Sequence, residues 1–300
     1  MQSRDNAVIA HNVARTWFGG NGTFATAADW TPNGAPRAGD TAIIKSGGVT
    51  IGAADGAGVN FSFQKIPGQG NPASLDFTSA GSYSIGTIRA SADARILLGD
   101  PGRTIVVTTA GIHVWGAQLS MGEFNSSNST LIVQGDSSVD HGGELSVRKV
   151  GTGGLPAGRV ENDGTMRVDA STLVVGALTG KGVIHATGNS TVTIDSASAS
   201  ETIQLQSGNL HITSGQPQFL APITNFGANS TITLDVVRAA TSEMFVKSSP
   251  RAGELFVYNG STVVADLHIS GQANIYAEKQ VGSVLLTAHD TGHSLPMGYA

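Results

Sequence analysis

The sequence contains no cysteine, and only 13% of its residues are charged, about half of the ~25% that is usual for soluble domains. The absence of cysteine excludes a disulfide framework, a thiolate metal site and a cysteine nucleophile. The 17 Lys and Arg residues are spread along the chain and the formal net charge is −5, so a nucleic-acid-binding surface is not expected. No apolar run is long enough for a transmembrane helix.

Strong helix formers and aromatic residues are also scarce. Glutamate occurs 7 times and lysine 6 times in 300 residues, and aromatic residues make up 6%. A helical or doubly wound α/β fold is therefore not expected. The chain is instead rich in glycine, serine and threonine (40, 30 and 28 residues), which together with valine and isoleucine favour turns and strands. A hydrophobic content of 40% is too high for a disordered chain.

From about residue 104, short apolar strands such as Thr104–Val107 and Thr130–Val133 alternate with Gly, Asn and Ser turns. A β-sandwich usually needs longer strands and a buried aromatic cluster, whereas each rung of a solenoid needs only a few small β-branched residues. We therefore predict an all-β chain that forms a right-handed parallel β-helix (a β-solenoid) with irregular rungs. The Asn-Ser-Thr sequences that begin at Asn128, Asn189 and Asn229 are predicted corners, because Asn tolerates left-handed backbone.

Both ends of the sequence differ from its middle. Residues 1–50, which hold Trp17 and Trp30, are predicted to form an N-terminal cap or docking segment, and residues 51–218 the solenoid rungs. Residues 219–300 are predicted to form a β-rich C-terminal cap with a polar tail. Within this region, Asn259-Gly260 between two apolar runs is the strongest hairpin signal in the chain.

The N-terminal pattern resembles a known class of protein. Thr16-Trp17, Trp30, Pro36, Gly39-Asp40 and Gly48-Val49-Thr50-Ile51 are similar to the start of the β-helical passenger segments of bacterial autotransporter, haemagglutinin and adhesin-type surface proteins. The C-terminal run from Phe219 to Leu286 resembles the terminal modules of such proteins. The resemblance implies a β-helix and a cell-surface location, and it supplies no catalytic motif.

The location of the protein is expected to be extracellular or on the cell surface. The lack of cysteine and the low charge favour the exterior, whereas Met1–Asn6 show neither the basic nor the apolar region of a signal peptide. The export route therefore stays open.

Four histidines share one setting, because His113, His185, His211 and His268 each lie between apolar residues that strand alternation directs inward. Aligned rungs would stack several of them into an outward column able to bind a divalent metal or respond to pH. We interpret them instead as solvent-facing strand residues. The segment His289-Asp290-Thr291-Gly292-His293 also combines two histidines with a carboxylate, and we interpret it as a polar tail. No metal ligand and no cofactor is therefore assigned.

Neither of two Gly-rich sequences has the pattern of a ligand-binding loop. Gly19–Phe24 lacks the aspartate of a calcium-binding β-roll, and Gly151–Leu155 is a turn with no following helix. Sequons for N-glycosylation occur at Asn21, Asn60, Asn125, Asn128, Asn189, Asn229 and Asn259, and chance explains most of them in a chain so rich in Ser and Thr.

Charged residues are densest between residues 136 and 169. The residues of this charged segment are Asp136, Asp140, His141, Glu144, Arg148, Lys149, Arg159, Glu161, Asp163, Arg167 and Asp169. If they converged on one face they would resemble the site of a polysaccharide lyase or hydrolase. The simpler interpretation is a solvated face with cross-strand charge pairs, so no catalytic residue is assigned.

The leading functional hypothesis is a non-enzymatic extracellular β-solenoid that associates with itself, through its ends, into a fibre, matrix or adhesin stalk on a bacterial surface. The alternative is a carbohydrate-active or carbohydrate-binding β-helix, for which Trp115 and Phe124 are the aromatic residues near the charged segment. Surface polysaccharide is then a second partner. A trimeric receptor-binding protein of the phage type shares the same fold.

Overall fold

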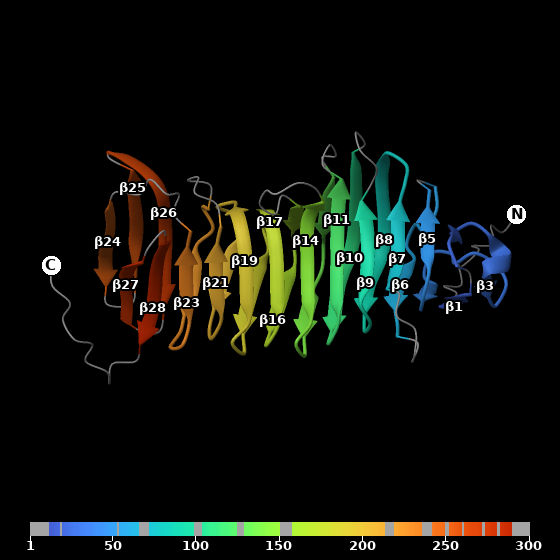
Figure 1. Ribbon diagram of the computed structural model, residues 1–300, viewed down its shortest axis with the longest axis horizontal. Coiled ribbons are helices and arrows are strands. Elements are labelled where there is room, and N and C mark those ends of the chain that lie inside the picture. The colour runs from blue at the N-terminus through green and yellow to red at the C-terminus, as the bar shows by residue number, and fades with distance from the viewer. Residues whose placement is uncertain are drawn as a thin grey trace, which may run out of the picture.

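The computed structural model describes residues 12–18, 20–52, 54–65, 72–98, 104–124, 129–150, 158–213, 219–235, 242–249, 252–259, 261–271, 274–280 and 283–289. These residues form an elongated stack of strands that run across its long axis, with the first strands at one end and the last at the other (Figure 1). Apart from a single 3-10 turn, η1 (Ala27–Asp29), they contain no helix. The predicted all-β class is confirmed, and the pairing is predominantly parallel.

Backbone pairing defines three ladders of strands. Ladder 1 runs the whole length of the stack and is parallel from β1 through β26, with antiparallel partners at its two ends. In spatial order it contains β3 (Trp30–Thr31), β1 (Ala14–Trp17), β4 (Thr41–Ile44), β6 (Asn60–Phe63), β8 (Gly81–Ala90), β10 (Ile105–Trp115), β13 (Ser137–Asp140), β16 (Thr165–Asp169), β18 (Val183–Thr187), β20 (Thr202–Leu205), β22 (Ile223–Phe226), β26 (Thr262–Gly271), β25 (Ala252–Asn259) and β24 (Ser242–Ser249).

Ladder 2 is parallel from β2 to β23 and antiparallel beyond it. Its strands in spatial order are β2 (Gly22–Thr23), β5 (Gly48–Ile51), β7 (Ala73–Phe77), β9 (Ala94–Leu98), β11 (Gln118–Phe124), β14 (Glu144–Val150), β17 (Thr172–Gly180), β19 (Thr191–Ala197), β21 (Asn209–Ile212), β23 (Thr231–Leu234), β28 (Ser283–His289) and β27 (Asn274–Gln280).

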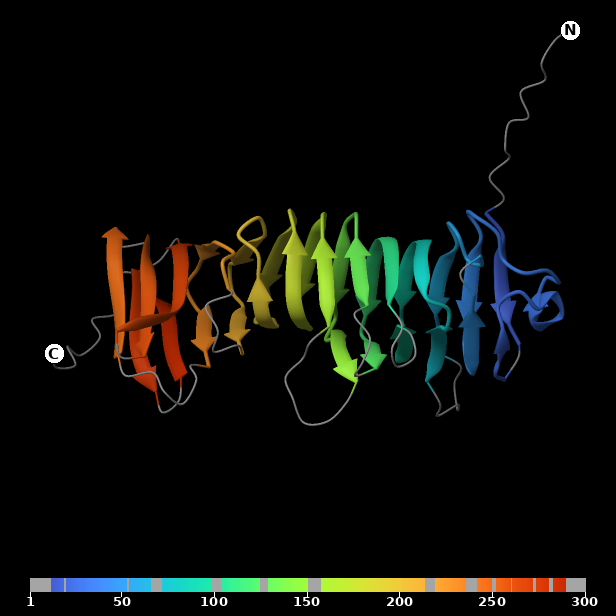
Figure 2. The same cartoon turned by 90° about the horizontal axis from the view of Figure 1, so that it is seen from above.

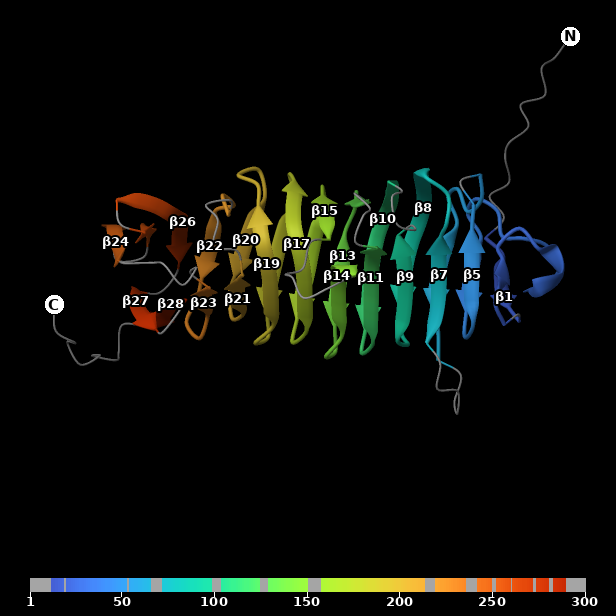
Figure 3. The same cartoon turned by 45° about the horizontal axis from the view of Figure 1, so that its top comes forward.

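Ladder 3 is the shortest and is confined to the middle of the stack. It consists of the first halves of β8 and β10, of β12 (Thr130–Val133) and β15 (Arg159–Asn162), and of the last residues of β17 and β19. Long strands such as β10 therefore bend from one ladder to the next. Strands β13, β14 and β15, which are labelled in the middle of Figure 3, follow one another in the chain but belong to ladders 1, 2 and 3, respectively.

Glycines allow the close approach of successive rungs at the corner between ladders 3 and 1. A Cβ on Gly135 would lie 2.3 Å from the carbonyl oxygen of Ala110, and a Cβ on Gly164 would lie 2.2 Å from that of Gly135. Only a residue without a side chain fits at these contacts. The Gly-rich composition thus has a specific use at this corner.

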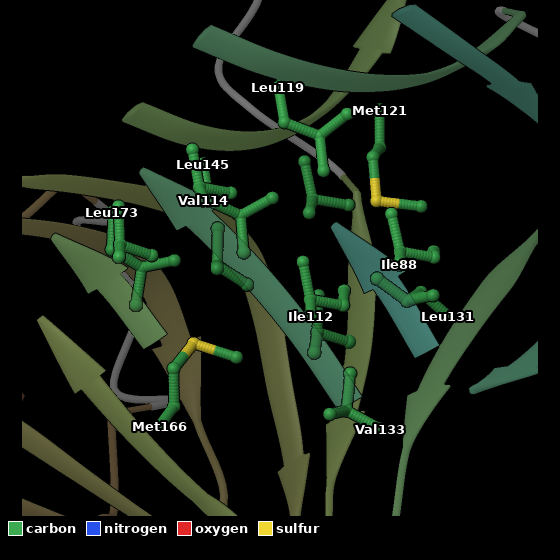
Figure 4. Packing of buried hydrophobic residues seen from close by; sticks show 14 of the residues in the cluster. Ile88, Ile112, Val114, Leu119, Met121, Leu131, Val133, Leu145, Met166 and Leu173 are labelled. Atoms are coloured by element: carbon green, nitrogen blue, oxygen red, sulfur yellow. The ribbon is translucent and has the colours of Figure 1, made fainter. Parts of the chain in front are cut away.

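The interior is filled by columns of aliphatic side chains from equivalent positions of successive rungs. In ladder 2, Leu119 pairs with Leu145 and Leu145 with Leu173, and all three are at most 1% exposed. Figure 4 shows these three leucines in one cluster with Val114 and Met166 of ladder 1. Most four-residue strands alternate half-buried and buried residues, which is the pattern of a strand with one face on a core. The predicted stacking of inward aliphatic residues is confirmed.

The rungs are irregular in length, as predicted. Successive ladder 1 partners Ser138 and Arg167 lie 29 residues apart, whereas Arg167 and His185 lie 18 apart. The predicted corner residues Asn189 and Asn229 have φ values of 60° and 67°, which confirms the left-handed backbone expected there. Asn128 lies outside the described residues.

An aromatic cluster closes the N-terminal end of the stack. The rings of Trp17 and Trp30 meet edge to face at 5.0 Å, those of Phe24 and Trp30 at 5.4 Å, and the Trp30 indole N–H donates to the carbonyl oxygen of Phe24. Both tryptophans are at most 3% exposed. The two indole rings therefore lie inside the first rung, whereas the ring of Phe18, the next residue after Trp17, is 71% exposed.

Asp40, from the Gly39-Asp40 pair of the N-terminal pattern, fastens this cap to the first rungs. Its carboxylate accepts hydrogen bonds from the amides of Val13 and Arg37 and from the guanidinium of Arg15, and the residue is 1% exposed. Burial alone would raise the pKa of Asp40, but these two amide donors and the adjacent Arg15 lower it below its usual value.

Antiparallel strands close the C-terminal end. Strands β24, β25 and β26 form a meander, and β26 joins this meander to the last parallel rung through β22. Strands β27 and β28 form a hairpin that joins the stack through β23. Figure 2 shows these orange and red strands at the C-terminal end of the stack. The antiparallel pairing of β25 with β26 confirms the hairpin predicted from Asn259-Gly260. Parallel pairing starts before residue 50 and extends beyond residue 218, and the domain boundaries at these residues stay predictions.

Candidate functional site

The charged segment at residues 136–169 does not form one site. Asp140 and Arg167 belong to strands of ladder 1, Glu144 to ladder 2, and Arg159 and Glu161 to ladder 3. The three ladders face different directions, so the segment is divided around the stack. The side chains of Arg148 and Lys149 lie outside the described residues. The alternative in which all these charges converge on one face is therefore wrong for those that the structure describes.

A shallow groove of about 570 Å³ lies along the outer face of ladder 3. Its lining residues are Thr130, Arg159, Glu161, Ala177, Leu178, Thr179, Ser196, Ala197, Ser198 and Leu220. Among these residues Glu161 is the one carboxylate and Arg159 the one cation. The described lining thus lacks the pair of carboxylates used in most glycoside hydrolysis.

The histidines do not stack into a column. His113 and His185 occupy the same outward position of ladder 1, but Ser138 and Arg167 lie between them, and His211 belongs to ladder 2. Burial, and next the charge of Arg89, lowers the pKa of His113; burial, and next Arg167, lowers that of His185. These two rings thus favour the neutral form.

His211 and His268 lie on the surface beside carboxylates. His211 Nε2 is 2.8 Å from an oxygen of Asp235. His268 Nδ1 is 3.2 Å from Glu254 Oε1, and its Nε2 is 3.8 Å from Asp266 Oδ1. Sequence reasoning noted His268 but missed its two acidic neighbours. The side chain of His289, and residues Asp290 and His293, lie outside the described residues.

Trp115 is an exposed aromatic ring at the end of β10. It is 56% exposed, and its ring stacks on that of His141 with a centroid distance of 3.3 Å and an angle of 25°. Trp115 pairs in register with Asp140, so a carboxylate lies on the neighbouring rung. The side chain of Phe124 lies outside the described residues.

Glu201 is a buried carboxyl group at the corner before β20. It is 0% exposed, its Oε2 accepts a hydrogen bond from the Asn162 side-chain amide at 3.3 Å, and its Oε1 has no partner. Burial raises the pKa of Glu201 to about 7, against the lowering effect of the hydrogen bonds from Asn162 and the Gly182 amide. It lies in the interior rather than in the groove, and sequence reasoning missed it.

The last surface feature is the backbone edges of the outermost strands at the two ends of the stack. Within the described residues, β24 pairs with β25 alone and β27 with β28 alone, so each offers one backbone edge at the C-terminal end. At the N-terminal end the outermost strands, β2 and β3, are two residues long.

Comparison with protein-family models, with curated proteins and with solved structures finds no match to this chain. In the part of the chain that the structure describes, no helix is long and apolar enough to span a membrane.

Proposed function

We propose that this protein is a non-enzymatic structural β-solenoid of the bacterial cell surface, wound as a right-handed parallel β-helix, that associates end to end into a fibre, matrix or adhesin stalk. The observation that carries the proposal is the unbroken backbone pairing of ladder 1 from β3 to β24. The right hand is supported by the strong preference of parallel crossover connections for it. The N-terminal resemblance to adhesin-type proteins supports the surface location.

The two ends carry the features that suit end-to-end contact. Strand β24 spans eight residues and β27 seven, and the exposed edges of long strands are ready templates for pairing with another chain. The opposite end has short edge strands and the exposed ring of Phe18. Among the described residues, a strand edge without a pairing partner at one end and an exposed aromatic ring at the other favour axial association.

Small polar residues line the outer face of ladder 2. For example, Thr172 pairs in register with Thr191, Thr191 with Asn209, and Asn209 with Thr231. The hydroxyl of Thr231 donates to Asn209 Oδ1 at 2.7 Å. Such ladders stabilise the sheet by cross-strand contacts. They support a structural role for this face.

Two single substitutions separate axial from lateral association. Phe18→Ser removes the exposed ring at the N-terminal end, and Leu220→Ser removes an exposed apolar side chain, 51% accessible, on the flank of the rod. Light scattering over a concentration series should show assembly weakened by Phe18→Ser and unchanged by Leu220→Ser. The axial model is wrong if Leu220→Ser weakens assembly and Phe18→Ser does not.

A second candidate function is binding of surface polysaccharide at Trp115. The exposed ring, held by His141 on one side and adjacent to the Asp140 strand position, has the character of a sugar-stacking platform. This function is compatible with a structural rod, because the ring lies on the flank rather than at an end.

A further inference from the structure

Three side chains with metal-binding atoms meet on the outer face of the C-terminal meander. Glu254 lies on β25, and Asp266 and His268 lie two residues apart on β26. Glu254 pairs in register with His268, so the three side chains share one face of the sheet. One ligand atom from each lies within 4.8 Å of the other two.

The inward face of the same strands is occupied by the core. Leu255, Leu267 and Ile269 are at most 3% exposed, whereas the side chains of Glu254, Asp266 and His268 are 47%, 39% and 55% exposed. The polar face is therefore accessible to an ion from solvent. The sheet beneath it is anchored to the solenoid through the pairing of β26 with β22.

The three groups lie near one another, but the two carboxylates approach different nitrogens of the His268 ring, and one ion binds only one of these nitrogens. One carboxylate therefore has to turn toward the nitrogen that holds the ion. Zinc binds histidine nitrogen and carboxylate oxygen at about 2.0–2.2 Å, so two ligands of a tetrahedral ion lie roughly 3.4 Å apart. His268 Nδ1 and Glu254 Oε1 are 3.2 Å apart. Asp266 Oδ1 is shielded from solvent, accepts no hydrogen bond, and lies 3.8 Å from His268 Nε2. A cation stabilises a carboxylate oxygen that is shielded from water and accepts no hydrogen bond.

We propose that Glu254, Asp266 and His268 form a binding site for a divalent transition metal of the zinc type. Imidazole nitrogen selects such ions over Mg²⁺ and Ca²⁺, which prefer all-oxygen shells. Three protein ligands on an exposed face leave one position of the tetrahedron to water. The ion links β25 to β26 and so fastens the terminal meander, including the edge strand β24, to the rod.

The pair formed by His211 and Asp235 provides a matched control. Its 2.8 Å contact is as close as any in the proposed site, but it brings only one nitrogen and one carboxylate together. A surface ion pair of this kind contributes little by itself. If zinc binding requires the third ligand, replacing His268 should weaken it and replacing His211 should not.

Isothermal titration of chelator-treated full-length protein with ZnCl₂ tests the proposal. One ion per chain should bind, with no heat from MgCl₂ or CaCl₂ under the same conditions. His268→Gln and Glu254→Gln should each weaken binding at least about tenfold, since loss of even an outer-shell partner costs about 10–100-fold. His211→Gln should leave the affinity unchanged. Circular dichroism of Glu254→Gln, which keeps the size of the side chain, verifies that the variant is folded.

The double variant His289→Gln/His293→Gln tests whether zinc binds instead at the two histidines near the C-terminus. If this variant loses zinc while His268→Gln retains it, the metal is bound at the C-terminal segment and the proposal is wrong. Unchanged affinity in both His268→Gln and Glu254→Gln, or equal binding of Mg²⁺, would overturn it as well. A rise in melting temperature with zinc that disappears in folded Glu254→Gln would support the proposed link between β25 and β26.

Discussion

Replacing Glu201 by glutamine should stabilise the fold at neutral and alkaline pH and have little effect in acid. Glutamine keeps the size of the side chain and an acceptor for the Asn162 and Gly182 donors, but it removes the ionisable group. The parent carboxyl is fully buried and has one oxygen without a partner. Its ionised form is therefore disfavoured in the folded chain.

The size and sign of the effect follow from the two pKa values. The pKa of Glu201 rises from an ordinary 4.5 to about 7 on folding, and one pKa unit corresponds to about 1.4 kcal/mol. Below pH 4.5 the group is protonated in both states and costs nothing. Between pH 4.5 and 7 the unfolded chain loses the proton while the folded chain keeps it, so stability falls as pH rises. Above pH 7 the loss levels off at about 3 kcal/mol.

Urea unfolding at pH 4, 6 and 8, followed by circular dichroism, measures this dependence. The free energy of unfolding of Glu201→Gln should exceed that of the parent by about 3 kcal/mol at pH 8, and by close to zero at pH 4. Gln204→Asn, in the same rung, changes no ionisable group and should give a difference that does not vary with pH. A constant difference between Glu201→Gln and the parent over this range would refute the reasoning.

Two further substitutions test the N-terminal cap and the second candidate function. Asp40→Ala leaves the Arg15 guanidinium and two amides without their acceptor and should lower the free energy of unfolding by about 3 kcal/mol, whereas Asp136→Ala on the surface should change it by less than about 0.5 kcal/mol. Equal effects in chemical denaturation would contradict the role of Asp40. Trp115→Ala should weaken binding to an acidic polysaccharide by at least about tenfold in a pull-down titration, and Leu220→Ser should not; equal binding by Trp115→Ala and the parent removes this candidate.

The fold class could be predicted because the signal is local. Strands such as Thr202–Leu205 and Thr231–Leu234 show inward aliphatic and outward polar residues over four positions. The left-handed Asn189 and Asn229 mark corners by their own backbone preference. Each of these features is decided within a few residues, so the sequence alone displays it.

The candidate metal site depends on register, which is not visible in the sequence. Near the turn, Asn259 pairs with Thr262 and Tyr258 with Val263; continued unchanged, this register would place Glu254 opposite Leu267. A bulge between Val257 and Tyr258 shifts the pairing by one residue, so Glu254 instead lies opposite His268. A shift of one residue moves a side chain from one face to the other, and the sequence carries no clear signal for it.

For a related reason, the sequence does not predict on which face of the stack each charged residue lies. Residues 136–169 are consecutive, but one rung passes through three ladders, so neighbours such as Asp140, Glu144 and Arg159 face different directions. Rungs of unequal length prevent these directions from being assigned by counting residues. Glu201 shows the same limitation, since its partner Asn162 lies two rungs away.

Negative-stain electron microscopy of the purified protein over a concentration series tests the central claim most directly. The thirteen steps between the strands of ladder 1, each about 4.8 Å, give a rod of roughly 60 Å. End-to-end association predicts filaments one rod wide that lengthen with concentration and repeat at about this distance. Single rods at every concentration, or rods that associate side by side, would contradict the axial assembly proposed for this protein.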